Sequence, residues 1–478
     1  MNQSKGLGIW ILTALVVGNM VGSGIFMLPR TLAEVASPAG VFLAWGFTGS
    51  GVLAIALVFG NLIIRKPALT GGPQIYAKEL FKSGSSLSTF SGFISSWGYW
   101  IGNLAGNVAI ITTFAGYLST FFPILVSQVE LFQVGTFTLK VGNALTFFVC
   151  TLLLWGIHFL ILQGVNGAGK INFVATLTKV IGFMLFIIIG LFAFQKSNIV
   201  PFVAPRLDED GQSLGLLSQV NRAAVSTLWA FVGVESAMVF ASRAKKQTDV
   251  KRATILGLLI ALAIYIGIST LVMGMLDQET LIHSDKPLID AIEPIFGSIG
   301  AKLLSGLGLI SLIGSTIGWV MLSAEVPYQA AKQGLFLRSF LKVNEKGMPA
   351  FSLVVTNSLG QLFIFSTVFN SIAAAFDFVI YIATLSYLIP YFISSIFQLR
   401  LVLTAETYEL QPRARWVDGI IAFLATIYSG WVIVAGTSDI KTFMFGMGLL
   451  LSGVFFYRNV THEEKWGIQR MEASTSGE

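Results

Sequence analysis

The segment Gly18-Asn19-Met20-Val21-Gly22-Ser23-Gly24-Ile25-Phe26 places three glycines and an asparagine inside an apolar stretch that runs from Leu7 to Leu28. A helix that crosses lipid must satisfy its own backbone hydrogen bonds, so a glycine-rich interruption at membrane depth is tolerated only where it faces protein or water. The segment therefore predicts an interrupted membrane helix that borders a binding site inside the bilayer.

The composition indicates a membrane protein along the whole chain. Of 478 residues, 54% are hydrophobic and 11% are charged, whereas a soluble domain has about 25% charged residues. Apolar runs of about 17 to 25 residues, each long enough to span a bilayer, recur with short polar connections. We expect an all-α integral membrane protein with twelve transmembrane helices, at about residues 7–33, 39–63, 88–118, 143–163, 171–195, 222–242, 253–276, 299–324, 351–369, 373–399, 416–436 and 441–457.

The lysines and arginines lie mostly in alternate loops, which predicts that these loops and both termini are cytoplasmic. The basic residues on that side are Arg65, Lys66, Lys78, Lys82, Arg243, Lys245, Lys246, Lys251, Arg252, Lys332, Arg338, Lys342, Lys346, Arg400, Arg413 and Arg415. The opposite loops carry Lys140, Lys196, Arg206 and Lys286 together with the acids Asp208, Glu209, Asp210, Asp277 and Glu279. This bias accounts for most of the net charge of +6, so we expect no nucleic-acid partner.

The sequence contains no pattern typical of catalysis or metal binding. The single cysteine, Cys150, lies within an apolar run and cannot form an intramolecular disulfide, and the three histidines are scattered. No Ser/His/Asp set or zinc-ligand spacing occurs. The turn Gly71-Gly72-Pro73 lacks the Lys-Ser/Thr pair of a phosphate-binding loop. We therefore expect neither an enzyme nor a metal or other cofactor.

The sixth apolar run repeats the character of the first. It reads Ser226-Thr227-Leu228-Trp229-Ala230-Phe231-Val232-Gly233-Val234-Glu235-Ser236-Ala237, with a glycine, small polar residues and one acid. It begins where a second set of five helices would start. Interrupted helices at corresponding positions of two halves are typical of transporters built from inverted repeats. We expect one repeat over residues 1–200, a second over 201–400, and two additional helices in 401–478, with helices 1 and 6 interrupted.

Interrupted helices also indicate the chemistry of the ligand. The N-terminal end of a half-helix presents free N–H groups to an anion, and unwound carbonyl groups accept a cation. A free amino acid carries both groups on one carbon atom. The pattern therefore favours an amino acid as the substrate.

With these motifs the chain resembles the amino acid-polyamine-organocation transporters. The matching segments are Gly22-Ser23-Gly24-Ile25-Phe26, Gly71-Gly72-Pro73, Trp229-Ala230-Phe231-Val232-Gly233-Val234-Glu235-Ser236 and Asn344-Glu345-Lys346-Gly347-Met348-Pro349. The resemblance covers nearly the whole chain, and the ordered set of motifs is more specific than any one of them.

Within that family the chain is most similar to the basic amino acid antiporters, which exchange arginine for ornithine or agmatine. The closer match lies in Trp100-Ile101-Gly102-Asn103, Gly116-Tyr117-Leu118, Phe121-Phe122-Pro123-Ile124-Leu125 and Gly318-Trp319. The resemblance implies an antiporter of the bacterial inner membrane that exchanges arginine, ornithine or lysine by alternating access. It also implies a homodimer and, since Cys150 is not in an outer loop, no glycoprotein subunit.

The resemblance further implies roles for residues of the first interrupted helix. Ser23 and Gly24 would hold the substrate carboxylate through backbone N–H groups and the hydroxyl, with Asn19 and Met20 close by. The alternative is that these small residues serve close helix packing.

The resemblance assigns the rest of the site to later spans. Carbonyl groups near Trp229 and Val232 would bind the α-ammonium, and the Trp229 ring would cover the cationic side chain. Asn103 and Trp319 would line the distal pocket, although an asparagine can also join helices and a tryptophan can mark the membrane interface. Glu235, a carboxylate in mid-span, would change its charge state during transport.

Lys179 lies in the middle of the fifth apolar run, too far from either end to reach the membrane surface easily. In many sodium-independent relatives a lysine at the matching position replaces a sodium ion between spans one and eight. The arginine/agmatine antiporters have a small apolar residue there, so Lys179 weakens the agmatine assignment. We expect a sodium-independent transporter, with proton coupling left open.

Three further polar residues lie in or next to the later apolar runs. We expect Glu325 to form an inner gate or a helix-end salt bridge, and Asp377 to be a polar residue at the membrane interface. Tyr381 falls near a distal-pocket position that is a serine in agmatine exchangers, and it would shorten the pocket if it faced inward.

Two other functions remain compatible with the sequence. One is a proton-coupled permease for neutral amino acids. The other is a membrane amino acid sensor that does not transport, although sensors of that kind usually carry a soluble signalling extension.

Overall fold

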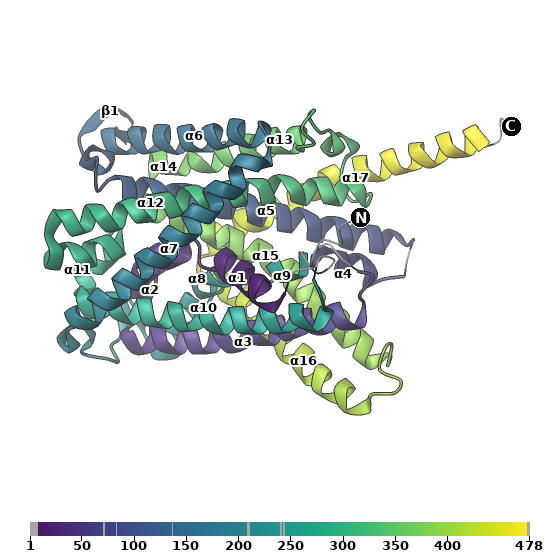
Figure 1. Cartoon of the computed structure of the whole chain (residues 1–478), viewed down its shortest axis with the longest axis horizontal. Helices are drawn as coiled ribbons and strands as arrows, with labels where there is room; N and C mark the ends of the chain where they lie inside the picture. Colours follow the sequence, from purple (N-terminus) through teal and green to yellow (C-terminus); the bar gives the residue numbers. More distant parts are fainter. Residues whose placement is uncertain are drawn as a thin grey trace.

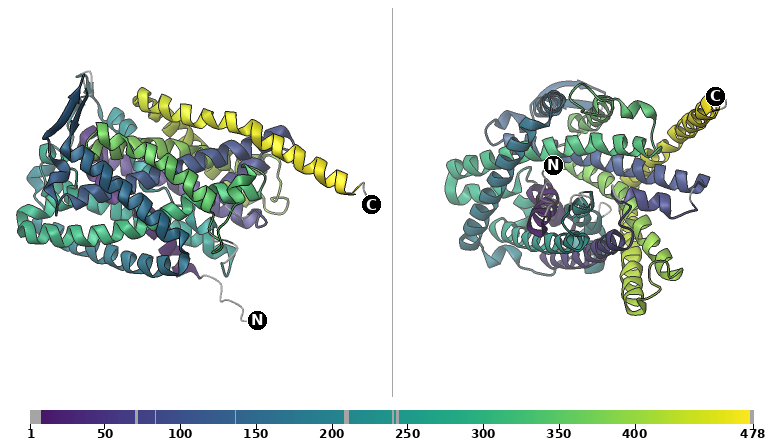
Figure 2. Two further views of the ribbon diagram at one scale, coloured as in Figure 1. Left: turned by 90° about the horizontal axis from the view of Figure 1, so that it is seen from above. Right: turned by 45° about the vertical axis from the view of Figure 1, so that its right-hand side comes forward.

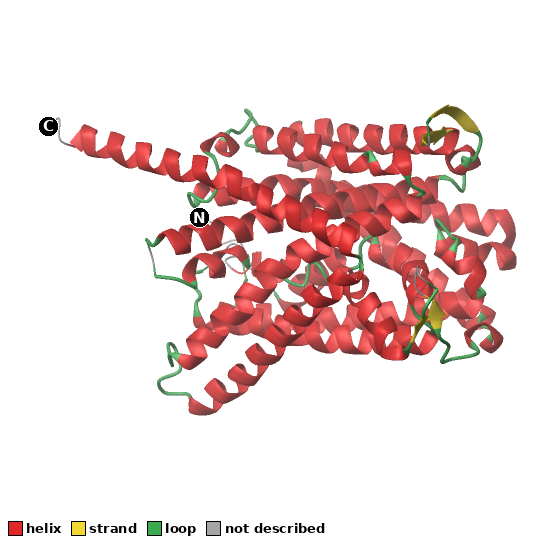
Figure 3. Ribbon diagram, turned by 180° about the vertical axis from the view of Figure 1, so that it is seen from behind, coloured by secondary structure: helices red, strands yellow, loops and turns green. Residues whose placement is uncertain are grey.

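The computed structural model describes residues 8–69, 72–82, 84–135, 137–207, 211–239, 241 and 244–475. Six residues named above lie outside the described residues: Leu7, Gly71, Asp208, Glu209, Asp210 and Arg243. Helices make up most of what is described (Figure 3).

The first half of the chain contains seven helices and one hairpin among the described residues. They are α1 (Ile9–Met20), α2 (Gly24–Val35), α3 (Pro38–Arg65), α4 (Gln74–Glu79), α5 (Ser86–Leu118), β1 (Glu130–Val134), β2 (Phe137–Lys140), α6 (Val141–Leu162) and α7 (Val165–Ala193).

The second half contains ten helices and a second hairpin among the described residues. They are β3 (Arg206–Leu207), β4 (Ser213–Leu214), α8 (Leu216–Ala230), α9 (Ser236–Val239), α10 (Gln247–Met275), α11 (Gln278–Ile282), α12 (Pro287–Lys332), α13 (Ala350–Ile364), α14 (Ser366–Phe369), α15 (Ile372–Leu403), α16 (Pro412–Ala435) and α17 (Ile440–Thr475).

Nine helices of the described chain are long and apolar enough to cross a membrane. The pair α1 and α2, which is bent by 47° at its break, makes a tenth if it is one span. The chain is therefore a multi-pass membrane protein.

Two short hairpins accompany the helices of this mostly helical chain. Strand β1 pairs with β2 and strand β3 pairs with β4, both antiparallel. Both hairpins lie at the end of the bundle remote from the C-terminus (Figures 1 and 3). They belong to connections between helices, and hydropathy does not predict the conformation of such connections.

The interrupted helices lie inside the bundle. Helices α1, α2, α8 and α9 occupy its middle in Figure 1, and α5 packs against both α12 and α15. Helices α16 and α17 lie at the periphery and project from the bundle (Figure 2). Most of α2 and of the second half of α8 is buried among the other helices, whereas Trp10 and Ile11 at the start of α1 are exposed.

Several helices begin where the sequence supplies a capping residue. The hydroxyl of Ser37 accepts a hydrogen bond from Gly40 N, and Pro38 occupies the first position of α3. The hydroxyl of Ser371 accepts from Ala374 N at the start of α15. Helix α12 begins at Pro287, earlier than the expected span 299–324. It continues through a kink at Gly297, whose φ of 63° is in the left-handed region that favours glycine.

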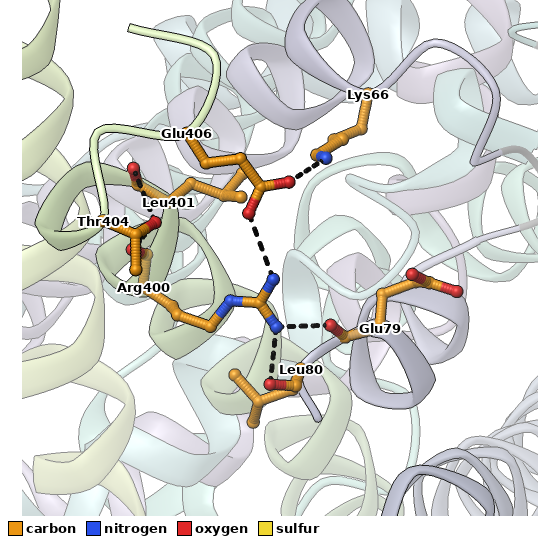
Figure 4. A network of polar contacts seen from close by, with 7 residues as sticks. All are labelled: Lys66, Glu79, Leu80, Arg400, Leu401, Thr404 and Glu406. Atoms are coloured by element: carbon orange, nitrogen blue, oxygen red, sulfur yellow. Dashed lines mark hydrogen bonds and ion pairs between the residues drawn. The ribbon is translucent and has the colours of Figure 1, made fainter. Parts of the chain in front are cut away.

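The connection between α15 and α16 is fastened to two other helices (Figure 4). The carboxylate of Glu406 bonds the ammonium of Lys66 at the end of α3 and lies 3.2 Å from Arg400. The Arg400 guanidinium donates to the carbonyl oxygens of Glu79 and Leu80, each at 2.7 Å, where α4 ends. A cation at a helix C-terminus complements the helix dipole. The connection therefore ties together the ends of α3, α4 and α15.

Candidate functional site

The first helix break separates α1 from α2 over residues 21–23. The N–H of Gly22 donates to the carbonyl of Met20 at 2.7 Å, a turn too tight for a helix to continue. Glycine lowers the cost of such a turn. The break lies in the segment from which the sequence predicts it.

The second helix break separates α8 from α9 over residues 231–235. Gly233 has a φ of +104°, which L side chains rarely adopt, and an added Cβ would lie 3.2 Å from backbone and side-chain atoms of Asn19. A glycine is therefore needed here for two reasons, its backbone angle and the close approach of α1.

The two breaks are joined by a side-chain hydrogen bond. Asn19 Nδ2 donates to Ser236 Oγ at 2.8 Å, and the Ser236 hydroxyl donates to the carbonyl of Gly233 at 2.5 Å. Residues more than two hundred positions apart in the sequence thus hold the unwound segments against each other.

A small cavity lies between the two breaks. Its lining residues are Asn19, Met20, Gly22, Ser23, Gly24, Ile110, Trp229, Val232 and Trp319. These include every predicted substrate-contacting residue except Asn103. The cavity volume is about 10 Å³, roughly the space for one water molecule. The space between the breaks, as the structure has it, is too small for an amino acid.

Ser23 presents a hydroxyl to this cavity. The residue is buried, and its Oγ has no hydrogen-bond partner among the described residues. Leaving a buried hydroxyl unpaired costs about 1–3 kcal/mol. Ser23 immediately precedes Gly24, the first residue of α2, so it occupies the N-cap position of that helix, although its hydroxyl makes no capping hydrogen bond.

Two tryptophans border the cavity on another side. The ring centroids of Trp229 and Trp319 are 6.0 Å apart, with an interplanar angle of 45°. Gly106 of α5 lies directly against both rings, since an added Cβ would be 2.6 Å from Trp229 and 3.1 Å from Trp319. Gly106 does not stand out in the sequence, because one glycine in a glycine-rich span carries no distinguishing signal.

Glu235 is buried next to the second break but does not line the cavity. Its carboxylate accepts hydrogen bonds from Tyr391 OH at 2.6 Å, Tyr99 OH at 3.1 Å and Gly233 N at 3.1 Å. The carboxylate therefore accepts three hydrogen bonds, which offset the free-energy cost of burying it. Neither tyrosine is predicted as a site residue from the sequence, where a polar hydroxyl within an apolar span is the signal for each.

Lys179 reaches the first interrupted helix from α7. Its ammonium lies 3.2 Å from Ser315 Oγ of α12 and 3.5 Å from the carbonyl of Gly18 on α1. Its side chain is buried, so the cation is held among these oxygen atoms. Lys179 thus connects α1 to α12 just before the break.

Asn103 and Glu325 lie outside the cavity. Asn103 is buried on α5 and donates to the carbonyl of Tyr99 at 2.6 Å, one turn earlier in the same helix. Glu325 accepts a hydrogen bond from Gln329, one turn later in α12. Each therefore has a local partner in this conformation.

Asp377 and Tyr381 differ from what the sequence suggests. Asp377 forms an ion pair with Arg30 of α2 and accepts a hydrogen bond from Thr31 at 2.6 Å, so it joins α2 to α15 and is not simply an interfacial polar residue. The Tyr381 hydroxyl bonds the carbonyl of Gly436 at the end of α16. Tyr381 therefore does not shorten the cavity.

Comparison with known proteins gives the chain its family. The amino acid permease family matches residues 7–455. A Bacillus subtilis strain 168 protein, provisionally named an arginine/ornithine antiporter, is 51% identical, and the match covers 97% of this chain and 98% of that protein.

Two more distant relatives match over similar lengths. An arginine/ornithine antiporter of Pseudomonas aeruginosa is 36% identical, with 96% of this chain and 92% of that protein covered. An arginine/agmatine antiporter of Chlamydia abortus is 32% identical, with 95% and 90% covered. The chain is a transporter of the amino acid permease family.

Proposed function

We propose that this protein is an antiporter that exchanges cationic amino acids, with arginine and ornithine as the first pair and lysine as a further substrate. The names of its relatives support arginine/ornithine exchange. The observation that carries the proposal is the unpaired, buried hydroxyl of Ser23 in a cavity bordered by two helix breaks.

The cavity offers complementary groups to a zwitterion. The substrate carboxylate binds Ser23 and the N–H groups at the start of α2, with Asn19 and Met20 beside it. The α-ammonium binds carbonyl groups of the unwound segment near Trp229 and Val232. The rings of Trp229 and Trp319 cover the cationic side chain, because an aromatic face attracts a guanidinium or ammonium group.

The distal and coupling groups surround this site. Asn103 lies one turn from Gly106 along α5 and would reach the side-chain end of the substrate only after the helices move apart. The charge state of Glu235 changes during the transport cycle, and Glu325 contributes to a cytoplasmic gate. The Lys179 ammonium occupies a cation position beside α1, which makes transport independent of sodium.

The architecture that fits this function has twelve spans. A total of twelve is supported if the bent pair α1–α2, helix α7 and the interrupted pair α8–α9 each form one span in addition to the nine apolar helices. We assign residues 1–200 and 201–400 to inverted repeats and 401–478 to two additional helices. The basic loops support cytoplasmic termini in a bacterial inner membrane, where the protein would form a homodimer.

Counterflow in liposomes tests this function. Vesicles loaded with ornithine should accumulate labelled arginine, whereas vesicles without internal substrate should not. A variant with Trp229→Ala provides the site-directed control and should lose the exchange. Uptake of neutral amino acids into empty vesicles, driven by a pH gradient, would instead establish the proton-coupled permease.

A further inference from the structure

One phenol contacts the ends of both interrupted helices. Tyr265 of α10 is buried, and its hydroxyl oxygen lies 2.6 Å from the carbonyl oxygen of Met20 and 2.6 Å from that of Ala230. Met20 is the last residue of α1 and Ala230 is the last residue of α8. The same hydroxyl therefore reaches each helix at the point where it breaks.

The surrounding rings hold the hydroxyl in place. The Tyr265 ring stacks on Trp45 of α3, with centroids 5.2 Å apart and an interplanar angle of 13°. Phe231 meets it edge-on at 5.4 Å, and the Trp45 indole N–H donates to Ser269 at 3.2 Å. The position of the hydroxyl is thus set by packing between α3 and α10, not only by its two acceptors.

The two carbonyl groups are favourable acceptors for such a donor, and the Met20 carbonyl also accepts from the N–H of Gly22 at 2.7 Å. Carbonyl groups at the C-terminal end of a helix lack intrahelical partners and carry the negative end of the helix dipole. Two such ends placed close together in an apolar interior repel each other. A tyrosine has one hydroxyl hydrogen, so it bonds one carbonyl fully at a time or shares the hydrogen between them.

The ends that Tyr265 joins lead directly into the cavity. Ser23 and Gly24 follow Met20 by three and four residues, and Trp229 and Val232 flank Ala230. An added Cβ on Gly24 would lie 3.6 Å from Ala230 Cα, so the start of α2 already packs against the end of α8. A change in the separation of Met20 and Ala230 therefore moves one side of the cavity relative to the other.

We propose that Tyr265 is a positioning residue that sets the separation between the carboxylate-binding and ammonium-binding sides of the cavity. It thereby favours α-amino acids over amines that lack the carboxylate. This inference rests on the proposed function. A ligand that contacts both sides depends on their separation, and a ligand that contacts only the carbonyl side does not.

The test compares arginine with agmatine, which is arginine without its carboxylate, in purified wild-type protein and in Tyr265→Phe. The phenylalanine keeps the ring contacts and removes only the hydroxyl. Titration calorimetry should show arginine binding weakened by about five- to tenfold and agmatine binding weakened by less than about twofold. The ratio of the affinity for arginine to the affinity for agmatine should therefore be smaller in Tyr265→Phe than in the wild type.

Tyr76→Phe is the matched control, because Tyr76 is equally buried on α4 and stacks on Phe397, away from the cavity. It should leave both affinities unchanged. Equal weakening of both ligands in Tyr265→Phe, no weakening of arginine, or failure of the variant to fold would each overturn the inference. If the wild-type protein binds neither ligand, the proposed function is wrong as well. Failure of the Tyr265 inference can therefore be distinguished from failure of the proposed function.

Discussion

Trp229 and Trp319 lie next to each other at the cavity, with ring centroids 6.0 Å apart, although ninety residues separate them in the sequence. Both rings rest on Gly106 of α5, which has no side chain to keep them away. The indole pair closes one side of a space too small for an amino acid. If the proposed function is correct, substrate entry requires the two rings to separate.

Replacing Gly106 by alanine should disturb this pair. The new methyl group would lie 2.6 Å from the Trp229 ring, and overpacking of this kind costs about 1–3 kcal/mol. We expect arginine exchange in liposomes to fall by about tenfold or more, since the ring of Trp229 must tilt into the cavity.

Gly448→Ala is the matched control, because nothing lies within 4 Å of an added Cβ on that α17 residue. It should exchange arginine at the wild-type rate. Wild-type exchange by Gly106→Ala would show that the two indoles do not border the substrate path.

Lys179→Met should slow exchange while the protein remains sodium-independent. The substitution removes a cation that bonds Ser315 and the Gly18 carbonyl, and hydrogen bonds to charged groups are worth about 1.5–3 kcal/mol. Uptake should fall by about tenfold or more, whereas Lys302→Met, a change of an exposed lysine on α12, should have no effect. Stimulation of wild-type uptake by sodium over N-methylglucamine would refute the proposed role of Lys179.

The ion pair between Arg30 and Asp377 should stabilise the protein cooperatively. Arg30 also contacts Glu34 at 3.1 Å and donates to the carbonyl of Ile282 at 3.0 Å. Asp377→Asn and Arg30→Gln should each lower stability by about 1–3 kcal/mol, a value between those of surface and buried pairs. The double variant should lose less than the two single losses together, as followed by thermal unfolding in detergent. Strict additivity would show that the two groups do not interact.

Glu406 should make a small, acid-sensitive contribution to stability. The hydrogen bond from Lys66, and then the contacts of Arg400, hold the pKa of Glu406 below its ordinary value of 4.5. A carboxylate with a lowered folded-state pKa stabilises the fold fully above its unfolded-state pKa, and the effect is lost as pH falls through the folded-state value.

Thermal midpoints of wild type and Glu406→Gln check this expectation between pH 7 and pH 3. The wild type should be more stable at neutral pH by about 0.5 kcal/mol, since the side chain is partly exposed and solvent screens the pair. The two midpoints should converge in acid. A difference that stayed constant over this range would contradict the linkage.

Local patterns in the sequence predict the helix breaks well. The glycines and small polar residues around Ser23 and Gly233 interrupt apolar runs, and the residues beside them line the cavity. Tyr265, Tyr99, Tyr391 and Gly106 could not be found in this way. Each acts through a contact with a segment far away in the sequence, and the residues next to it do not indicate that contact. The ion pair of Asp377 with Arg30 depends in the same way on how α2 and α15 pack.

An experimental map of the protein in saturating arginine tests the central claim most directly. The account predicts density for one arginine between the two helix breaks, with its carboxylate at Ser23 and Gly24 and its side chain against Trp229. Arginine bound elsewhere, or an empty space between the breaks at a concentration that saturates exchange, would contradict it.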